Sequence, residues 1–280
     1  MNSKILKNIY FQTCCDELKV FKPGNHSLFS SISGMSEIKF RYAAKISSEY
    51  LTNKKLSLGE AVFNSAQSCK TQLNSNYNLG IIMLCAPILR VCLKDKVKNF
   101  KLELKNLLSS ISNKDGKLIL RAIEVVEPAG IKKYEGIGNI FTSNNLNFFE
   151  IMKIGSRWDR VSRCYTENYR EIFDFGLPIL KLLKNKIAID KAIQILYLNF
   201  LANSTDSHIL RKIGKKRANI IMKKGLQCKK KFKVFKNNYN LIKEFDLYLK
   251  KFHSNPGTCA DLTVTTLLMY KINDIFKHPL

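Results

Sequence analysis

Residues that divide a chain into separate parts are scarce in this sequence. Its 280 residues include only 6 prolines and 13 glycines, and no stretch rich in Pro, Gly or Ser separates the two halves. No repeat with a period of roughly 20 to 50 residues is present, which excludes a solenoid. Because 45% of the residues are hydrophobic, the chain can bury one large core. We therefore predict a single domain over residues 1–280.

Histidine is also scarce, and the cysteines lack the spacing of a metal site. None of the four histidines lies four residues from another, and the eight cysteines form no Cys-x-x-Cys pair. Several cysteines fall in apolar helical segments, where a thiol behaves as a small hydrophobic group. We expect neither a zinc site nor disulfide bonds.

No apolar run is long enough to cross a membrane. The longest uncharged run, residues 79–89, ends at Arg90, whereas a bilayer requires about 20 residues. The first ten residues contain two lysines and lack the apolar centre of a signal peptide. These features predict a cytoplasmic protein with no membrane partner.

Acidic residues are few relative to basic ones. The 47 Lys and Arg against 22 Asp and Glu give a formal net charge of +25. Such a field attracts polyanions such as nucleotides, coenzyme A or nucleic acid. A general drift of composition toward Lys, Asn and Ile explains the same excess without a functional reason, and the count does not choose between the two.

Helical periodicity fills most of the chain, and alternating strand patterns are nearly absent. Apolar residues recur at helical spacing in residues 58–73, 101–111, 187–201, 209–222, 241–252 and 260–275. Residues 79–91 are apolar almost all round, which predicts a helix buried at the centre. We predict an all-α fold, a single compact domain of about ten or more helices.

Five polar interruptions separate these helical segments. Irregular backbone in a helical protein is where polar groups can face a ligand, so we look for the site there. The interruptions are residues 22–27, 74–78, 127–130, 203–207 and 255–258.

The last interruption contains the sequence Asn255-Pro256-Gly257-Thr258. The Pro-Gly pair predicts a tight turn, and Thr258 followed by Asp261 approximates a capping box before an apolar helix. A helix N-terminus of this kind can hold a phosphate. An ordinary capped helix after a turn explains the same residues.

The first two interruptions have related compositions. Lys22 and Gly24 provide a cation and a close backbone approach, which suits a phosphate, although a plain loop lysine is the simpler interpretation. Asn78 is placed to cap the helix that follows. Asn76 has no such duty, so its amide is a candidate to bind a base, a ribose hydroxyl or a metal-bound water; simple turn polarity is the alternative.

Two further segments place carboxylates beside cations. Asp159 and Arg163 begin a run of opposite charges spaced four residues apart on one predicted helix, interleaved with aromatic residues. Asp206 precedes Arg211 and Lys212 by about one helical turn, a layout that suits a carboxylate-bound metal beside phosphates. Solvated ion pairs and a capped basic helix are the alternatives.

Taken in order along the chain, these segments resemble the triphosphoribosyl-dephospho-coenzyme A synthase family. The resemblance runs from residue 22 to about residue 270, and the segment 255–262 carries the most of it. The matching segments are 22–25, 76–80, 159–165, 173–178, 206–214 and 255–262.

The resemblance implies an all-helical transferase that joins ATP to 3'-dephospho-coenzyme A and releases adenine. Its product would be the precursor of the prosthetic group of citrate lyase or malonate decarboxylase. Substitution at the anomeric carbon of a ribose passes through an oxocarbenium-like state. It needs a base for the attacking hydroxyl, negative charge near the developing cation and donors for the triphosphate.

On this resemblance, the candidate catalytic residues are Asp159, Asp206 and Asp261, one of them the base, and Asp206 is also a candidate magnesium ligand. ATP is the implied substrate, Mg²⁺ the implied cofactor and a coenzyme A precursor the implied acceptor. The candidate residues for binding nucleotide and phosphate are Lys22, Gly24, Asn25, Asn76, Asn78, Arg163, Arg211, Lys212, Asn255, Gly257 and Thr258.

The chain departs from the family at two points. Better-known members carry a His and a Lys in an Asn-Thr-His-Lys-Gly stretch where this chain has Asn78 and Leu79. They also carry a His and an acidic residue after the first Pro-Gly loop, where this chain has residues 30–36 and then Glu37. A related nucleotide-dependent transfer in another cofactor pathway, such as that of a pterin one-carbon carrier, is therefore an alternative.

A second alternative comes from a different class of protein. Residues 215–236 are densely basic, with Phe232 and Phe235 interleaved, as in surfaces that bind single-stranded nucleic acid. This hypothesis predicts binding that weakens steeply with salt. It leaves the Pro-Gly loops and the asparagines without a role, so we favour the transferase.

Overall fold

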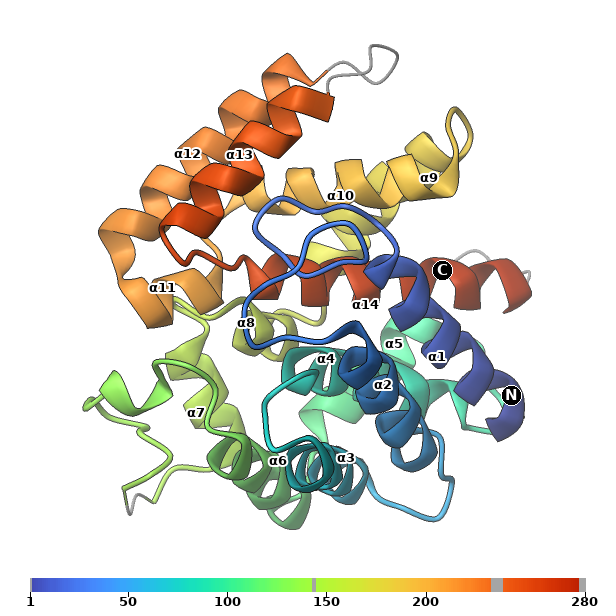
Figure 1. The fold of residues 1–280 in the computed structure, drawn as a ribbon. Helices are drawn as coiled ribbons and strands as arrows, with labels where there is room; N and C mark the ends of the chain where they lie inside the picture. The colour runs from blue at the N-terminus through green and yellow to red at the C-terminus, as the bar shows by residue number, and fades with distance from the viewer. Residues whose placement is uncertain (1, 143–144, 233–238, 277–280) are drawn as a thin grey trace.

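The structure is a computed structural model, and it describes residues 2–142, 145–232 and 239–276 (Figure 1). These residues form α-helices joined by a 3-10 helix and a π-helix, with no strand among them, which confirms the all-α prediction. The elements are α1 (Ser3–Leu18), α2 (Glu37–Leu51), α3 (Leu58–Leu73), α4 (Leu79–Cys92), α5 (Phe100–Ser109), α6 (Asn113–Val126), η1 (Ile131–Lys133), α7 (Phe148–Gly155), α8 (Arg160–Thr166), η2 (Glu171–Gly176), α9 (Leu177–Lys184), α10 (Ile189–Asn203), α11 (Ser207–Ile213), α12 (Lys215–Lys231), α13 (Tyr239–Lys251) and α14 (Gly257–Phe276).

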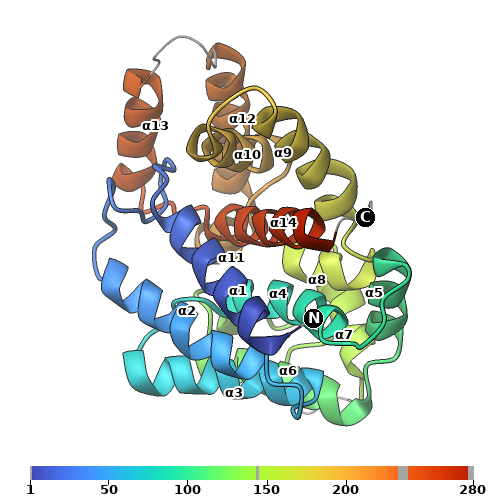
Figure 2. The ribbon, with the colours of Figure 1, turned by 90° about the vertical axis from the view of Figure 1, so that its right-hand side faces the viewer.

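Two apolar helices, α4 and α14, lie in contact at the centre. Figures 1 and 2 show α14 crossing the middle of the molecule, with α10, α12 and α13 on one side and α2, α3, α4 and α6 on the other. In α4 every side chain except Gly80 and Arg90 is buried. The predicted buried helix is therefore confirmed, because apolar residues on all its faces require neighbours on all sides.

Pro87 lies inside α4, where its missing N–H would leave the carbonyl of Met83 without its helical partner. The hydroxyl of Tyr165 donates to that carbonyl at 2.7 Å. The next carbonyl, of Leu84, accepts from the hydroxyl of Tyr169 at 2.8 Å. Buried tyrosines thus stabilise the central helix at the point where proline weakens it.

Two of the predicted helices are wrong. The apolar stripe over 209–222 is divided between α11 and α12 by Gly214, whose φ of +90° is outside the helical region. The charged helix expected from Asp159 onward ends at Thr166, because Asn168 and Tyr169 adopt positive φ of 51° and 59° before η2 begins.

The structure also shows where the cysteines lie and how long and apolar the helices are. All eight cysteines are buried. None of the described helices combines the length and the apolarity that a membrane span requires.

Candidate active site

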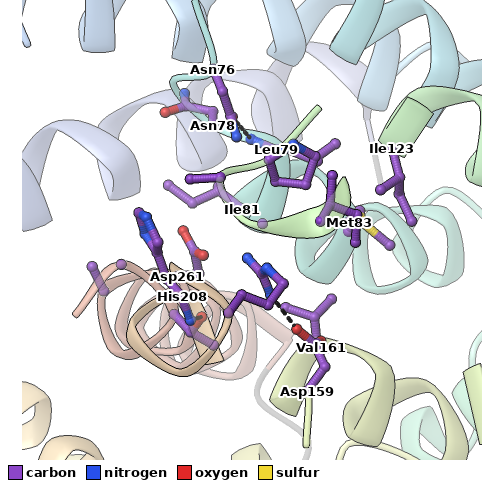
Figure 3. Close-up of a pocket in the computed structure, with 18 of the residues that line it drawn as sticks. Asn76, Asn78, Leu79, Ile81, Met83, Ile123, Asp159, Val161, His208 and Asp261 are labelled. Carbon is purple, nitrogen blue, oxygen red and sulfur yellow. Dashed lines mark hydrogen bonds and ion pairs between the residues drawn. The ribbon is translucent and has the colours of Figure 1, made fainter. Parts of the chain in front are cut away.

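A cavity of about 250 Å³ lies beside the N-terminal ends of α4 and α14 (Figure 3). Four of the five polar interruptions reach it, and the fifth, 203–207, contributes only through the adjacent His208. Its wall therefore combines loop residues that are far apart in sequence. Apart from tyrosine, tryptophan and cysteine, the polar side chains that line it are Glu17, Asn25, His26, Arg41, Asn76, Asn78, Asn139, Asp159, Ser162, His208, Arg211, Asn255, Thr258 and Asp261, with Gly257 and Gly80 contributing backbone.

Asp159 and Arg211 form an ion pair at one side of this cavity. Asp159 is the N-cap of α8, and its Oδ1 accepts from the backbone N–H of Ser162 at 2.9 Å. Its Oδ2 lies 2.6 Å from Nη1 of Arg211 on α11. The Nε of Arg211 is buried and has no hydrogen-bond partner among the described residues. This guanidinium therefore retains a donor for a ligand.

Asp261 lies in the second turn of α14 and faces the cavity. Its carboxylate packs against Gly80 in the first turn of α4, in space that a Cβ at position 80 would occupy. Burial raises the pKa of Asp261 well above its usual range, and the charges of Asp206 and Glu17 add to the rise while Arg211 opposes it. Figure 3 shows this carboxylate beside His208 and directed toward Ile81. Of the three aspartates predicted to be catalytic, it is the one with a strongly raised pKa.

His208 is a cavity residue that the sequence analysis missed. Its Nδ1 would lie 2.7 Å from a Cβ on Gly257, so the glycine makes room for the imidazole. Its backbone N–H donates to Oγ1 of Thr258 at 3.2 Å. Burial lowers the pKa of His208, with Arg211 and Lys212 adding to the effect and Asp206 opposing it. Its position in the sequence could have indicated its place at the cavity, because His208 follows Ser207 at the start of a helix and precedes Arg211 by three residues.

The asparagines that were predicted to bind ribose or base gather around the cavity. Nδ2 of Asn25 donates to Oδ1 of Asn255 at 2.9 Å, which joins the two Pro-Gly loops. Asn76 accepts from the backbone N–H of Leu79 at 3.4 Å. Asn78 makes no cap bond with its side chain; its amide donates to the carbonyl of Tyr77 at 2.8 Å and accepts from Ala44 N–H at 3.2 Å. The capping duty predicted for Asn78 is therefore supplied by Asn76.

Lys22 and Gly24 lie outside the cavity lining, which corrects their predicted contact with phosphate. The Lys22 ammonium is fully buried, donates to the carbonyls of Glu17 and Val20 at 2.8 and 3.0 Å, and pairs with the Glu17 carboxylate at 3.2 Å. Gly24 has φ +75° and donates to Oδ1 of Asp246 at 2.7 Å. Both residues shape the loop that presents Asn25.

Asp206 is buried, does not line the cavity, and has both oxygens occupied by backbone. Oδ1 accepts from the N–H of Ile209 at 3.0 Å and Oδ2 from the N–H of Cys259 at 2.8 Å, so one carboxylate caps both α11 and α14. Thr258, expected to begin a capping box with Asp261, lies inside α14, and its Oγ1 accepts from the backbone N–H of His208. In the described ranges no cluster of three or more His, Cys, Asp or Glu side chains could hold a metal ion. The structure thus gives Asp206 a capping role in place of the predicted metal ligand.

Two predicted cations also lie away from the cavity. Arg163 donates from Nε to the carbonyl of Ser156 at 3.3 Å, and Lys212 is exposed. Neither lines the cavity, because α8 and α11 turn these side chains to other faces. Of the neighbouring pair Arg211 and Lys212, only Arg211 reaches the site.

Buried charges that the sequence analysis did not single out support the site. Arg160 is fully buried, pairs with Glu171, and donates to the carbonyl of Phe200 and to Sγ of Cys259, both at 3.2 Å. Glu17 lines the cavity, and its Oε1 forms the ion pair with the Lys22 ammonium. Burial raises the pKa of Glu17, and Lys22 opposes the rise. The spacing of residues along the sequence does not indicate that Arg160 and Glu17 are buried.

The basic segment proposed as a nucleic-acid surface is only partly described. Residues 215–231 form α12, whereas Phe235 and Lys236 lie outside the described residues. Phe232 is partly buried and packs against the hydrophobic core.

Comparison with known proteins gives a family. Residues 3–279 match the family described as ATP:dephospho-CoA triphosphoribosyl transferase. No individual curated protein gives a sequence match. Among solved structures, a proposed triphosphoribosyl-dephospho-coA synthase from Archaeoglobus fulgidus has the same fold, with a TM-score of 0.62 and 20% identity over 81% of this chain and 97% of that one. The chain therefore belongs to the ATP:dephospho-CoA triphosphoribosyl transferase family and is a transferase.

Proposed function

We propose that the cavity transfers the triphosphoribosyl group of ATP to a hydroxyl of 3'-dephospho-coenzyme A, with Asp261 as the general base. The observation that carries this proposal is the Asp261 carboxylate, which faces the cavity between two helix N-termini and has a strongly raised pKa. In this reaction the acceptor oxygen bonds to the anomeric carbon of the ATP ribose, and the bond from that carbon to adenine breaks.

The raised pKa suits a base. A carboxylate with an ordinary pKa of about 3.9 takes up a proton weakly, whereas a base with a pKa closer to the working pH is more effective. Asp261 would accept the hydroxyl proton as the new bond forms. Glu17, whose charge acts on Asp261, would add negative potential near the developing oxocarbenium ion.

The triphosphate would lie against donors on the polar side of the cavity. Arg211 has an unpaired Nε, and the first turns of α4 and α14 present backbone N–H groups with a positive helix dipole. The side chains of Asn25, Asn255 and Asn76, which also line the cavity, would bind the ribose through their amides.

Magnesium fits this charge balance. The cavity is lined by three carboxylates, from Glu17, Asp159 and Asp261, against the two guanidinium groups of Arg41 and Arg211. A triphosphate needs more positive charge than these residues offer. Magnesium is usually held by one or two carboxylates together with substrate phosphates. Both oxygens of Asp159 already have partners in Ser162 and Arg211, so the ion would be held chiefly by the phosphates. The ion would neutralise phosphate charge.

The cavity wall at the first turn of α4 bears on the choice of acceptor. Leu79 is buried and lines the cavity, so this wall offers no cation where better-known members of the family carry His and Lys. A related acceptor without a charged group at this position, such as a pterin, is the second candidate.

A direct assay tests the proposal. The protein is incubated with ATP, Mg²⁺ and dephospho-coenzyme A, and released adenine is detected by mass spectrometry, with Asp261→Asn as the control. We expect adenine and a joined product from the unmodified protein alone. Adenine that appears only with a pterin acceptor would select the second candidate, and no adenine with either acceptor would reject the reaction.

The proposed substrates and the cysteines indicate the cellular compartment of the reaction. The proposed substrates are cytoplasmic metabolites, and the cysteine spacing predicts no disulfide framework, as is usual in a reducing compartment. We therefore assign the reaction to the cytoplasm.

A further inference from the structure

One side of the cavity, which adjoins the Asp159–Arg211 ion pair, is largely apolar and carries two aromatic rings. It is formed by α6, α7 and the chain between them, together with Trp158 just after α7 and Val161 in α8. The rings of Tyr134 and Trp158 lie with centroids 5.1 Å apart and planes inclined by 40°. The apolar side chains that complete this side are Leu120, Ile123, Ile131, Ile140, Ile151, Met152, Ile154 and Val161.

The loop that carries Tyr134 is fixed from several directions. The hydroxyl of Tyr134 donates to the carbonyl of Ile137 at 2.8 Å, and its carbonyl accepts from Nδ2 of Asn139 at 2.6 Å. Gly130, with φ +81°, packs against the backbone of Arg211, where a Cβ would overlap it. The Tyr134 ring is therefore held in place beside the cavity before any ligand arrives.

We propose that Tyr134, Trp158 and the apolar residues around them form a subsite for a purine base. The apolar walls exclude a phosphate, and they favour a group with a flat, weakly hydrated face. Aromatic side chains stack on any base through its π-face, and an ordered ring loses little entropy on binding. This inference rests on the proposed function and deepens it, because both ATP and dephospho-coenzyme A carry adenine.

The protein contains its own reporter for this subsite, because Trp158 is its only tryptophan. Trp158 emission is followed during separate titrations with adenosine, ATP, dephospho-coenzyme A, pantetheine and inorganic triphosphate, with excitation where adenine does not absorb. We expect adenosine to change the emission and pantetheine and triphosphate to leave it unchanged. Competition of ATP and of dephospho-coenzyme A against adenosine then shows which substrate supplies the base.

A pair of variants in one loop makes the test independent of fluorescence. Adenosine binding is measured by calorimetry for Tyr134→Ala and for Ile137→Ala, whose side chain is exposed and does not line the cavity. We expect Tyr134→Ala to weaken binding by about 5- to 150-fold, the loss of one stacked ring, and Ile137→Ala to have no effect. Equal affinities for the two variants would overturn the proposal.

The tests of the purine subsite and the assay of the transfer reaction can fail independently of each other. Adenosine that binds through Tyr134 without any adenine release from ATP would keep the subsite and reject the transfer. Adenine release that is insensitive to Tyr134→Ala, with no change in Trp158 emission, would keep the transfer and reject the subsite. A response of Trp158 to pantetheine but not to adenosine would also reject it, because the subsite would then bind the alkyl arm of the acceptor.

Discussion

Oδ2 of Asp206 accepts a hydrogen bond from the backbone N–H of Cys259 at 2.8 Å, across 53 residues of sequence. The other oxygen of the same carboxylate caps α11 through Ile209. Asp206 therefore fixes the start of α14, and with it the position of Asp261, without lining the cavity itself.

Asp206→Ala should lower stability more than an ordinary surface substitution. Each lost cap costs about 0.5–2 kcal/mol, so two caps correspond to roughly 1–4 kcal/mol. Urea unfolding measures the change, and Asp206→Asn, which keeps one acceptor oxygen, should lose about half as much. Unchanged stability with lost turnover would indicate a catalytic role for Asp206 instead.

Lys22→Met should destabilise the fold rather than weaken nucleotide binding. The substitution leaves the Glu17 carboxylate buried without its cation, and breaking a buried pair in this way costs about 3–5 kcal/mol. The double variant Lys22→Met, Glu17→Gln should recover part of the loss in urea unfolding. A stable Lys22→Met protein with a raised KM for ATP would support the phosphate contact that the sequence predicted.

Arg211→Gln should raise the KM for ATP, because the cavity loses its cation beside the phosphates. A hydrogen bond to a charged group contributes about 1.5–3 kcal/mol, so we expect a rise of about 10- to 150-fold. Lys212→Gln is the matched control, since Lys212 is exposed and lies off the cavity. Initial-rate kinetics compare them, and equal effects would mean that only general charge attraction is lost.

Gly80→Ala should reduce turnover because its methyl group would occupy the space of the Asp261 carboxylate. The control is Gly225→Ala in α12, where a Cβ approaches the Leu201 side chain at 3.2 Å, far from the cavity. The rate of adenine release should fall for the first variant and remain for the second. Full activity of Gly80→Ala would show that the position of Asp261 is not critical.

Features set by neighbouring residues were predictable from the sequence. The apolar periodicity over 58–73 coincides with α3, whose ends are set by nearby residues: Ser57 and Glu60 form a capping box at its start, and Asn74 ends it with φ 51°. The apolar surface of α4 likewise predicted its burial. The polar interruptions were correctly located because turn and cap residues reveal them locally.

Features set by contacts between distant residues were not predictable. Spacing suggested that Asp159 pairs with Arg163, but the packing of α11 brings Arg211 to it. Asp206 was predicted to be a metal ligand because one of its partners, the backbone N–H of Cys259, lies 53 residues away in the sequence. Nothing near Lys22 indicated that its ammonium would be buried by the loop it belongs to.

The ionisation of Asp261, the proposed base, should also affect the stability of the fold. Because burial raises the pKa of Asp261 in the folded protein, its charged form destabilises the fold, and stability falls as the pH rises from the unfolded value of about 3.9 through the folded pKa. Asp261→Asn should therefore be at least as stable as the unmodified protein at neutral pH, as thermal unfolding can show.

The most direct measurement is the pH dependence of kcat/KM for adenine release. We predict that activity requires ionised Asp261, so the acidic limb should lie well above the ordinary aspartate pKa of about 3.9. Asp261→Asn should fold and bind ATP but release no adenine. An Asp261→Asn protein that retains turnover with the same acidic limb would contradict the account.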